Sequence, residues 1–304
     1  MASRTSLYFK KGPGGKIAIE DMGRSTGARF FVHATIGTDG TAYGATPEKP
    51  FASLDYAIGN CTASKGDIIY LMPGHAETTT AIAADVIGIQ IIGLGTGRLK
   101  PALTATAAAT DLLNISAANI HVENIRFVGA ASLCTALIDI AAADAEIVKC
   151  VFEQAATPVS AITVTAAGLR FSVQGCYFTQ SANGPDYGIE IEGHVTGWRV
   201  ENTCFNYSLG GLDNAAIAVS SADCAPNGFI KDIQCIGMDA LAIDFNSSDT
   251  AAADGLITGL RVTTTLANSI DNVIDLGGYC LLDGLVTNAA AKGGTKIPTT
   301  TTAG

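Results

Sequence analysis

The feature that most constrains the fold of this chain is a short phrase that returns about every 25 residues. The phrase reads ENIRF, VKCVF, QGCYF, ENTCF, DIQCI, TGLRV and DGLVT in its successive copies. We take one apolar residue of each copy as its anchor, and these anchors are 25, 26, 28, 31, 25 and 25 residues apart: Ile125, Cys150, Cys176, Cys204, Cys235, Leu260 and Leu285. Spacing this regular predicts a repeat architecture.

A second series of short segments has the same period. LNI, IDI, ITV, IEI, IAV, IDF and IDL alternate apolar and variable residues and end at Ile115, Ile140, Val164, Ile191, Val219, Phe245 and Leu276. Such alternation is typical of a short strand with one buried face. Two short strands in a unit of about 25 residues leave no room for a crossover helix, so βαβ units are excluded. We therefore predict an all-β, single-stranded parallel β-helix, in which each coil of chain, or rung, pairs with the next at about 4.8 Å.

The cysteines fit this prediction better than they fit a metal site or a redox motif. The chain has eight cysteines, and no two of them have the close spacing of zinc ligands or of a CxxC pair. We expect Cys150, Cys176, Cys204 and Cys235 to stack in one interior ladder as buried free thiols. Free thiols are typical of synthesis in a reducing compartment.

The segment PFASLDYAIGNC, residues 50–61, predicts a cap for the N-terminal end of the coil. Phe51, Leu54 and Ile58 recur at helical spacing after Pro50, which suits a first helical position. We expect an amphipathic helix of one to three turns before the first strand, DIIYLM. A solenoid needs such a cap because its terminal rung exposes apolar core and unpaired strand edges.

Charge divides the chain into a basic arm and an acidic body. Residues 1–30 carry six basic and two acidic groups, so the remainder carries 12 basic and 26 acidic groups, a net charge of −14. A solvated leader and an arm that docks on an acidic neighbour both explain this arm. We predict an N-terminal arm over 1–45, a cap region over 46–64, a β-helix of about nine rungs over 65–290 and a C-terminal tail over 291–304. The acidic body disfavours nucleic acid, and the chain shows neither a secretory signal nor a membrane span, so we expect synthesis in a host cytoplasm.

Several sequence segments of this chain resemble segments of known proteins. PFASLDYAI and GDIIYLMPG resemble the opening of right-handed, pectate-lyase-like β-helix proteins, and GHAET, GRSTGARFFV and GTDGTAYG are similar to β-helix virion proteins of tailed bacteriophages. The resemblance implies a right-handed coil in which Asp67 turns the chain into the first strand and Pro73-Gly74 ends it. It offers no catalytic counterpart for His75 and Glu77, which we expect to hold that turn or to contact a neighbouring subunit.

The outward middle positions of the second series are the first place to look for chemistry. They are Asn114, Asp139, Thr163, Glu190, Ala218, Asp244 and Asp275. Asp244 and Asp275 fall on adjacent rungs, about 5 Å apart, which is close to the separation of the two carboxyl groups in a retaining glycosidase. The flanking positions supply no aromatic platform and no basic residue to hold a sugar acid, so we favour a non-catalytic interpretation.

The remaining candidates have simple structural interpretations. We expect Glu190 and Glu192 to form a solvated edge and not a metal site, Trp198 to serve in the core or at a subunit contact, and His121 with Glu123 to form a surface salt bridge. The four histidines are too dispersed for a metal cluster: His33, His75, His121 and His194. The sequence thus predicts no catalytic, cofactor-binding or metal-binding residues.

These observations and the resemblance together give a functional expectation. We expect a protein that is not an enzyme, namely a capsid decoration or cement protein that binds the major capsid protein on the virion surface. Three copies are expected to associate as a homotrimer through uncharged faces, with the basic arm as the anchor. The alternative is a phage tailspike or tail-fibre β-helix that binds or cleaves bacterial surface polysaccharide.

Overall fold

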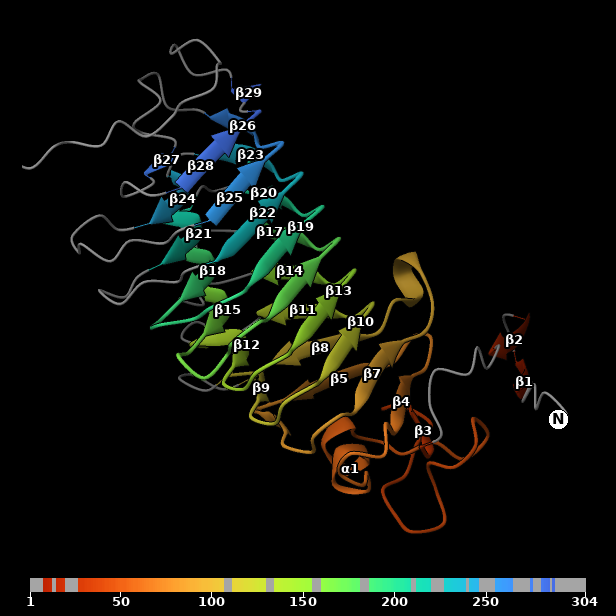
Figure 1. Ribbon diagram of the computed structural model, residues 1–304. Coiled ribbons are helices and arrows are strands. Elements are labelled where there is room, and N and C mark those ends of the chain that lie inside the picture. Colours follow the sequence, from red (N-terminus) through yellow and green to blue (C-terminus); the bar gives the residue numbers. More distant parts are fainter. Residues whose placement is uncertain are drawn as a thin grey trace, which may run out of the picture.

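Three parallel β-sheets run the length of the molecule and enclose a single apolar core (Figure 1). The computed structural model describes residues 8–12, 15–19, 27–106, 111–129, 134–154, 160–180, 186–208, 212–219, 227–238, 241–245, 255–264, 274–275, 280–284 and 286–287. Successive strands of the chain pass from the first sheet to the second and then to the third. The next rung begins again beside the first strand, so each of these three sheets is parallel.

Each sheet collects one strand from each rung. The first sheet contains β3 (Arg29–Val32), β4 (Ile68–Leu71), β7 (Gln90–Gly93), β10 (His121–Glu123), β13 (Glu146–Val148), β16 (Ser172–Gln174), β19 (Arg199–Glu201), β22 (Gly228–Lys231), β25 (Gly255–Thr258) and β28 (Cys280–Asp283). The second contains β5 (Ala76–Thr79), β8 (Ala102–Ala105), β11 (Arg126–Gly129), β14 (Val151–Gln154), β17 (Tyr177–Gln180), β20 (Cys204–Asn206), β23 (Gln234–Met238), β26 (Arg261–Thr264) and β29 (Val286–Thr287). The third contains β6 (Ile82–Ala84), β9 (Leu113–Ile115), β12 (Ala136–Ile140), β15 (Ser160–Val164), β18 (Tyr187–Ile191), β21 (Ala215–Val219), β24 (Leu241–Phe245) and β27 (Ile274–Asp275).

A rung has three strands, where the sequence predicts two. The first-sheet and second-sheet strands of a rung are separated by a short bend in which one residue adopts a left-handed conformation. In β10 and β11 that residue is Asn124, with φ 61°. The same position is left-handed on the following rungs: Lys149, Gly175, Asn202, Asp232, Gly259 and Gly284. Because the bend is so short, the two strands read in sequence as one segment.

The third sheet has the predicted register. Ile115, Ile140, Val164, Ile191, Val219 and Phe245 are aligned on consecutive rungs, and so are the outward middle residues between Asn114 and Asp275. Leu276, the last member of the apolar series, lies outside the described residues.

The predicted ladder of four cysteines is wrong in its second half. Cys150 and Cys176 lie on adjacent rungs at the same position, but Cys204 aligns with Tyr177, and Cys235 aligns with Phe205. The correct anchor of ENTCF is Thr203, because the phenylalanine of each phrase sets the register. Phe127, Phe152, Phe178 and Phe205 stack with ring centroids 5.4, 4.5 and 4.5 Å apart. Six cysteines are free thiols: Cys61, Cys134, Cys150, Cys176, Cys204 and Cys235.

The tryptophan belongs to the core, which is one of the two roles predicted for it. Trp198 is 1% exposed and stacks on Phe171 with ring centroids 6.0 Å apart. A Cβ atom at Gly228 would lie 2.3 Å from the indole ring, so the neighbouring rung needs a glycine there.

A short helix covers the N-terminal end of the coil, as predicted. Helix α1 (Leu54–Gly59) buries Leu54, Ala57 and Ile58 and is capped by the side chain of Ser53. Pro50 is not its first residue, because the helix begins four residues later. A 3-10 helix, η1 (Gly97–Leu99), is the other helical segment of the described residues. No helix in this part of the chain is long and apolar enough to cross a membrane.

Buried polar groups hold the cap together. The Asp67 carboxylate is 1% exposed and accepts hydrogen bonds from the amides of Ala28 at 2.6 Å and Thr62 at 2.7 Å. His75 Nδ1 accepts from the Ala34 amide at 3.1 Å, and Nε2 lies 3.3 Å from a Glu77 carboxylate oxygen.

The Glu77 carboxylate extends this network to the helix, because it accepts a hydrogen bond from the Leu54 amide at 2.9 Å. His75 and Glu77 are 1% and 8% exposed. They therefore hold the first turn, as predicted, from a buried position. Asp67 likewise lies at the entry to the first strand, where the resemblance places it.

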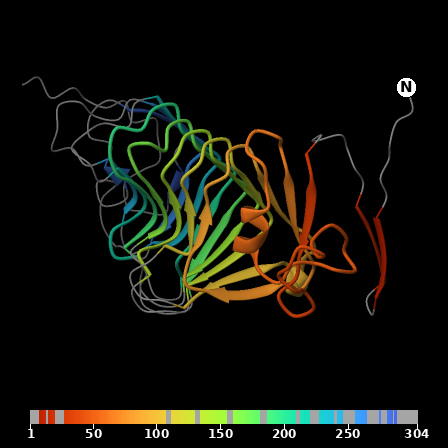
Figure 2. The same cartoon turned by 90° about the horizontal axis from the view of Figure 1, so that it is seen from below.

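The N-terminal segment divides into two parts. Strand β3 lies inside the 1–45 range but pairs in parallel with β4, so the first sheet begins earlier than residue 65. Ahead of it, β1 (Tyr8–Gly12) and β2 (Gly15–Ile19) form an antiparallel hairpin that belongs to none of the three sheets. Figures 1 and 2 show this hairpin standing clear of the coil, beyond its N-terminal end. The predicted tail at 291–304 lies outside the described residues.

Candidate functional site

Carboxyl groups gather on the outer side of the third sheet. Asp139 and Glu190 occupy outward positions two rungs apart, with Thr163 between them in register. Asp111 precedes β9, and Glu192 follows β18. The strands of this sheet contain neither lysine nor arginine. We call Asp111, Asp139, Glu190 and Glu192 the carboxylate cluster.

Asp139 is the most perturbed member of the carboxylate cluster. Burial raises the pKa of its carboxyl to about 6, and the charges of Asp111 and Glu192 add to the increase. The Asn114 side chain donates a hydrogen bond to Asp139 Oδ2 at 3.1 Å. The other oxygen, Oδ1, is buried and has no hydrogen-bond partner among the described residues. A carboxyl group in such surroundings exchanges its proton close to neutral pH.

The neighbours of Asp139 shift in the same direction. Burial raises the pKa of Glu192, with further contributions from the charges of Glu190 and Asp111. Burial also raises the pKa of Asp111. The phenol of Tyr187 has a raised pKa because of burial and, next, the charge of Glu190. No cation among the described residues contributes to these shifts in pKa, so mutual repulsion between carboxyl groups is a shared property of this site.

The prediction of a solvated position is wrong for Glu190. Its side chain was expected at a solvated edge, yet it is only 7% exposed, and Ser160 Oγ donates a 2.6 Å hydrogen bond to its carboxylate. The alternation of the strand indicates which residues point outward, but it does not indicate what covers them. Glu192 is exposed, as expected.

The pair Asp244 and Asp275 has the predicted register. The two residues are direct partners on β24 and β27, one rung apart. The charge of Asp244 also contributes to the raised pKa of Tyr187, so this residue belongs to the same electrostatic neighbourhood as the carboxylate cluster. The side chain of Asp275 lies outside the described part of the structure.

In chemical terms, the carboxylate cluster brings together a proton donor and charged acceptors. A carboxyl group with a pKa near 6 beside other carboxyl groups is the arrangement used for general acid and base catalysis. Such a shift is also produced by burial alone, so it marks a candidate site and does not identify a reaction. No group of three or more metal-ligand side chains with suitable geometry occurs among the described residues.

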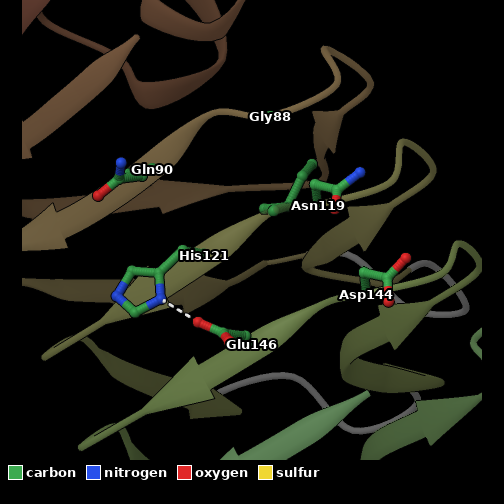
Figure 3. Close-up of a pocket in the computed structure, with 7 residues that line it drawn as sticks. Gly88, Gln90, Asn119, His121, Asp144 and Glu146 are labelled. Atoms are coloured by element: carbon green, nitrogen blue, oxygen red, sulfur yellow. Dashed lines mark hydrogen bonds and ion pairs between the residues drawn. The ribbon is translucent and has the colours of Figure 1, made fainter. Parts of the chain in front are cut away.

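A second polar site lies on the outer face of the first sheet. It is an open groove of about 550 Å³ that spans three consecutive rungs (Figure 3). Its lining includes two parallel rows of residues: Gly88, Asn119 and Asp144 before the strands, and Gln90, His121 and Glu146 within them. His121 Nδ1 lies 3.0 Å from a Glu146 oxygen, and Nε2 lies 3.4 Å from Glu123. The predicted pairing of His121 and Glu123 is confirmed.

Opposite charges alternate around this groove. Lys149 Nζ lies 2.9 Å from Glu123, and hydrogen bonds from Lys149 and His121 lower the pKa of the Glu123 carboxyl, although burial alone would raise it. Arg170 donates two hydrogen bonds to Asp144, at 2.7 and 2.6 Å, and thereby lowers the pKa of that carboxyl. The groove is thus largely charge-compensated.

The histidines are dispersed, as the sequence predicts. His121 lies in the groove, His194 is exposed at the end of the third sheet, and His33 and His75 pack edge to face in the cap with ring centroids 6.4 Å apart.

Comparison with known proteins gives a fold and no family. No family model and no curated protein matches this chain. Among solved structures, a rhamnogalacturonan lyase superposes with a TM-score of 0.60 at 11% identity, over 84% of this chain and 73% of that one. Pectate lyase Pel9A superposes with a TM-score of 0.60 at 8% identity, over 88% and 80%. The chain has the pectate-lyase-like parallel β-helix fold.

A phage protein is also among the solved structures that match. ORF18 of Geobacillus virus E2 matches at 10% identity with a TM-score of 0.45, over 77% of this chain and 56% of that one. A TM-score this low supports no argument about function.

The comparison corrects the expectation that the chain is not an enzyme. Both structures that superpose at 0.60 are polysaccharide-acting lyases by their names, so the fold cannot be used to exclude enzymatic activity. Identities of 8% and 11% show the fold alone and assign no reaction. The sequence analysis also treated Glu190 and Glu192 as a solvated edge, whereas Glu190 is buried within the carboxylate cluster.

Sequence reasoning missed Asp111, and it placed Glu192 at a solvated edge without linking it to Asp139. Both residues lie outside the strands, so the period of the repeat does not align them with Asp139. The available signal was compositional, because acidic residues recur around the third-sheet segments while basic residues are absent from them.

Proposed function

We propose that the chain is a structural protein of a bacteriophage particle, a capsid decoration protein whose coil stands on a shell of major capsid protein. The observation that carries the proposal is the basic hairpin β1–β2, which is joined to an acidic coil and pairs with none of its sheets. A rigid body with a separate basic arm suits attachment to an acidic surface.

The residues that resemble phage virion proteins support the proposal because they form one structural unit. GRSTGARFFV, GTDGTAYG and GHAET meet in the cap: the Ala28 amide bonds to Asp67, the Phe31 amide bonds to the Gly44 carbonyl, and the Ala34 amide bonds to His75. The segments that carry the resemblance therefore contact one another in one structural unit, although they are separated in the sequence.

Binding to shells tests this proposal. Purified chain would be mixed with shells of the major capsid protein that lack it, and the bound fraction would be measured by co-sedimentation. We expect saturable binding that weakens with salt, and loss of binding for a variant without residues 1–19, which retains β3 and the whole coil. Absence of binding, or density for the chain in the tail of intact particles, would contradict the proposal.

A second candidate function is recognition or cleavage of bacterial surface polysaccharide by a phage tailspike or tail fibre. The carboxylate cluster favours it, because Asp139 has a pKa of about 6 beside other carboxyl groups on one face. The names of the similar structures, a rhamnogalacturonan lyase and a pectate lyase, are consistent with this class of substrate.

A cleavage assay tests the second candidate. Capsular polysaccharide and lipopolysaccharide of the host would be incubated with the chain, and new reducing ends would be counted. We expect turnover to fall at least a hundredfold in Asp139→Asn, the size typical for loss of a general acid. Asp244→Asn tests the neighbouring pair, and exposed Glu48→Gln is the matched control. No turnover by the wild type would remove cleavage from this candidate.

A further inference from the structure

We infer that the open edge of β5 receives an extended segment of the major capsid protein, which adds one strand to the second sheet. The inference rests on the proposed function and deepens it, because it names the contact that the coil itself makes with the shell. It fails separately from that function, since the hairpin contact and the β5 contact respond to different variants.

The cap closes the first strand of two of the three sheets. On the first sheet the outer edge of β3 is paired, because the Phe31 amide donates to the Gly44 carbonyl and the Phe51 amide donates to the Phe31 carbonyl, both at 2.8 Å. On the third sheet the Ala83 amide of β6 donates to Asp55 Oδ1 of helix α1 at 3.2 Å. The outward amides at these two ends therefore have partners within the chain.

The first strand of the second sheet has no such cover among the described residues. The carbonyls of His75 and Thr79 accept hydrogen bonds from amides of β8 and of the residue after it, at 2.9 and 3.0 Å. Backbone groups alternate between the two sides of a strand, so Ala76 and Thr78 direct their N–H and C=O groups away from β8. Both residues are exposed, and these groups have no partner in the described part of the chain.

The side chains of this edge leave room for another strand. Ala76 and Thr78 are small and uncharged, whereas the Glu77 carboxylate between them is buried in the cap, where it accepts the Leu54 amide. Natural sheets protect an open edge with charged side chains, with proline or with a covering segment. Among the described residues, none of these devices lies on the β5 edge.

An extended peptide is the ligand that suits this edge. The edge presents two donors and two acceptors in a row, and an added strand pairs with such a row through its own main chain. Two edge residues form only a few hydrogen bonds, so this contact is weak by itself. It adds to the contact of the hairpin, because a chain already held at one point meets the second contact at a high effective concentration.

The position of the edge favours the shell as the source of the peptide. β5 is the terminal strand of its sheet at the N-terminal end of the coil, and the hairpin β1–β2, to which we assign the shell contact, stands beyond the same end (Figures 1 and 2). A second coil that approached end to end would meet α1 and residues 44–51 first, because they cover the neighbouring edges. An extended segment can lie along β5 beside them.

Hydrogen exchange of the full chain, free and bound to shells of the major capsid protein, tests the inference. In the free chain the amides of Ala76 and Thr78 should exchange rapidly, whereas those of Glu77 and Thr79 are protected by pairing with β8. Binding to shells should slow exchange at Ala76 and Thr78 at least tenfold. Mass spectrometry with fragmentation of the peptides resolves these neighbouring amides.

Thr78→Pro provides a second measurement. It removes one outward donor and spares the bonds to β8, and proline is accepted on edge strands. Shell binding, measured by co-sedimentation, should weaken about tenfold. Because no charge changes, the loss should persist at high salt, where the contribution of the hairpin is screened.

Ala63→Pro is the matched control for the introduction of a proline. Ala63 is exposed and is the second residue of the turn 62–65, in which Ser64 has a φ of 61°. Proline is common at the second position of such a turn, so this variant should bind shells as the wild type does.

Two results would overturn the inference and leave attachment to the shell intact. One is shell binding with unchanged exchange at Ala76 and Thr78, and the other is wild-type affinity of a Thr78→Pro chain whose circular dichroism shows that it is folded. Protection of the two amides in a concentrated chain without shells would assign the edge to a second copy and would also overturn it. Absence of shell binding by the wild type would overturn both the inference and the proposed function.

Discussion

The outer faces of the first and third sheets have the same backbone geometry, but charges are compensated on the first and uncompensated on the third. On the first sheet, carboxylates alternate with cations, as in the pairs of Glu123 with Lys149 and of Asp144 with Arg170. On the third sheet, Asp139 and its neighbours repel one another, and no cation in the described part of the chain contributes to their pKa shifts. The rung spacing of about 4.8 Å is the same in both cases.

This difference shows that stacking in a β-helix amplifies whatever charge pattern the sequence supplies. Two unit charges 4 Å apart interact by about 1 kcal/mol in bulk water and about 4 kcal/mol at an effective dielectric of 20. Repetition along the coil therefore stabilises a compensated face and perturbs an uncompensated one. A face that retains such repulsion is a stronger candidate for chemistry than a face that removes it.

The largest expected effect is a loss of stability when a charge is placed on the core-facing side of the third sheet, compared with a charge on its outer side. Ile140 is fully buried, and it follows the outward Asp139 on β12. Ile140→Asp places an unpaired charge in the apolar ladder and should lower the free energy of unfolding by at least about 3 kcal/mol. Urea denaturation measures the change. Ser116→Asp, at an exposed position just after β9, is the control and should cost less than about 0.5 kcal/mol.

The next largest effect is a dependence of folding stability on pH. Asp139 has a folded-state pKa of about 6 against an ordinary value of 3.8, so the folded state binds more protons than the unfolded state between these values. Stability should therefore fall as the pH rises from about 4 to about 6. After discounting for partial exposure, we expect a loss of about 1 kcal/mol. Asp139→Asn should remove most of this slope.

Denaturation curves at pH 4.5, 5.5 and 7.0 would test this slope. If the stability of the wild type changed with pH over this range in the same way as that of Asp139→Asn, the pKa of the Asp139 carboxyl would not be raised in the folded state. The comparison must be made between variants at each pH, since the other carboxyl groups also titrate.

A smaller effect is expected from a substitution that adds a cation to the outer face of the third sheet, as on the outer face of the first sheet. Glu192→Lys places a cation near Asp139 and removes one of the charges that raise its pKa. We expect the pKa of Asp139 to fall by about one unit, which carbon-detected NMR titration can follow. Glu48→Lys, remote from the cluster, should leave that pKa unchanged. An unaltered value in Glu192→Lys would indicate that burial alone causes the shift.

The sequence predicted the architecture and half of the site. Period and alternation placed every described outward residue from Asn114 to Asp275 in register, because identical rungs repeat one geometry. Anchoring on cysteine misplaced Cys204 and Cys235, since apolar character alone does not separate neighbouring positions. The burial of Glu190 and the approach of Asp111 to Asp139 could not be predicted, because they depend on segments between strands that vary in length and lie outside the repeat.

The smallest effect is expected on the compensated face. Arg170 and Asp144 are 53% and 36% exposed in their side chains, so their hydrogen-bonded pair should contribute only a small amount to stability. Arg170→Gln should lower stability by that amount at low salt and by less at about 1 M salt, where screening acts within about 3 Å. Arg199→Gln, an exposed arginine on the next rung, is the matched control. A loss that is large or independent of salt would mean that packing of the Arg170 stem outweighs its charge, and the contrast between the two faces would then rest on burial more than on charge.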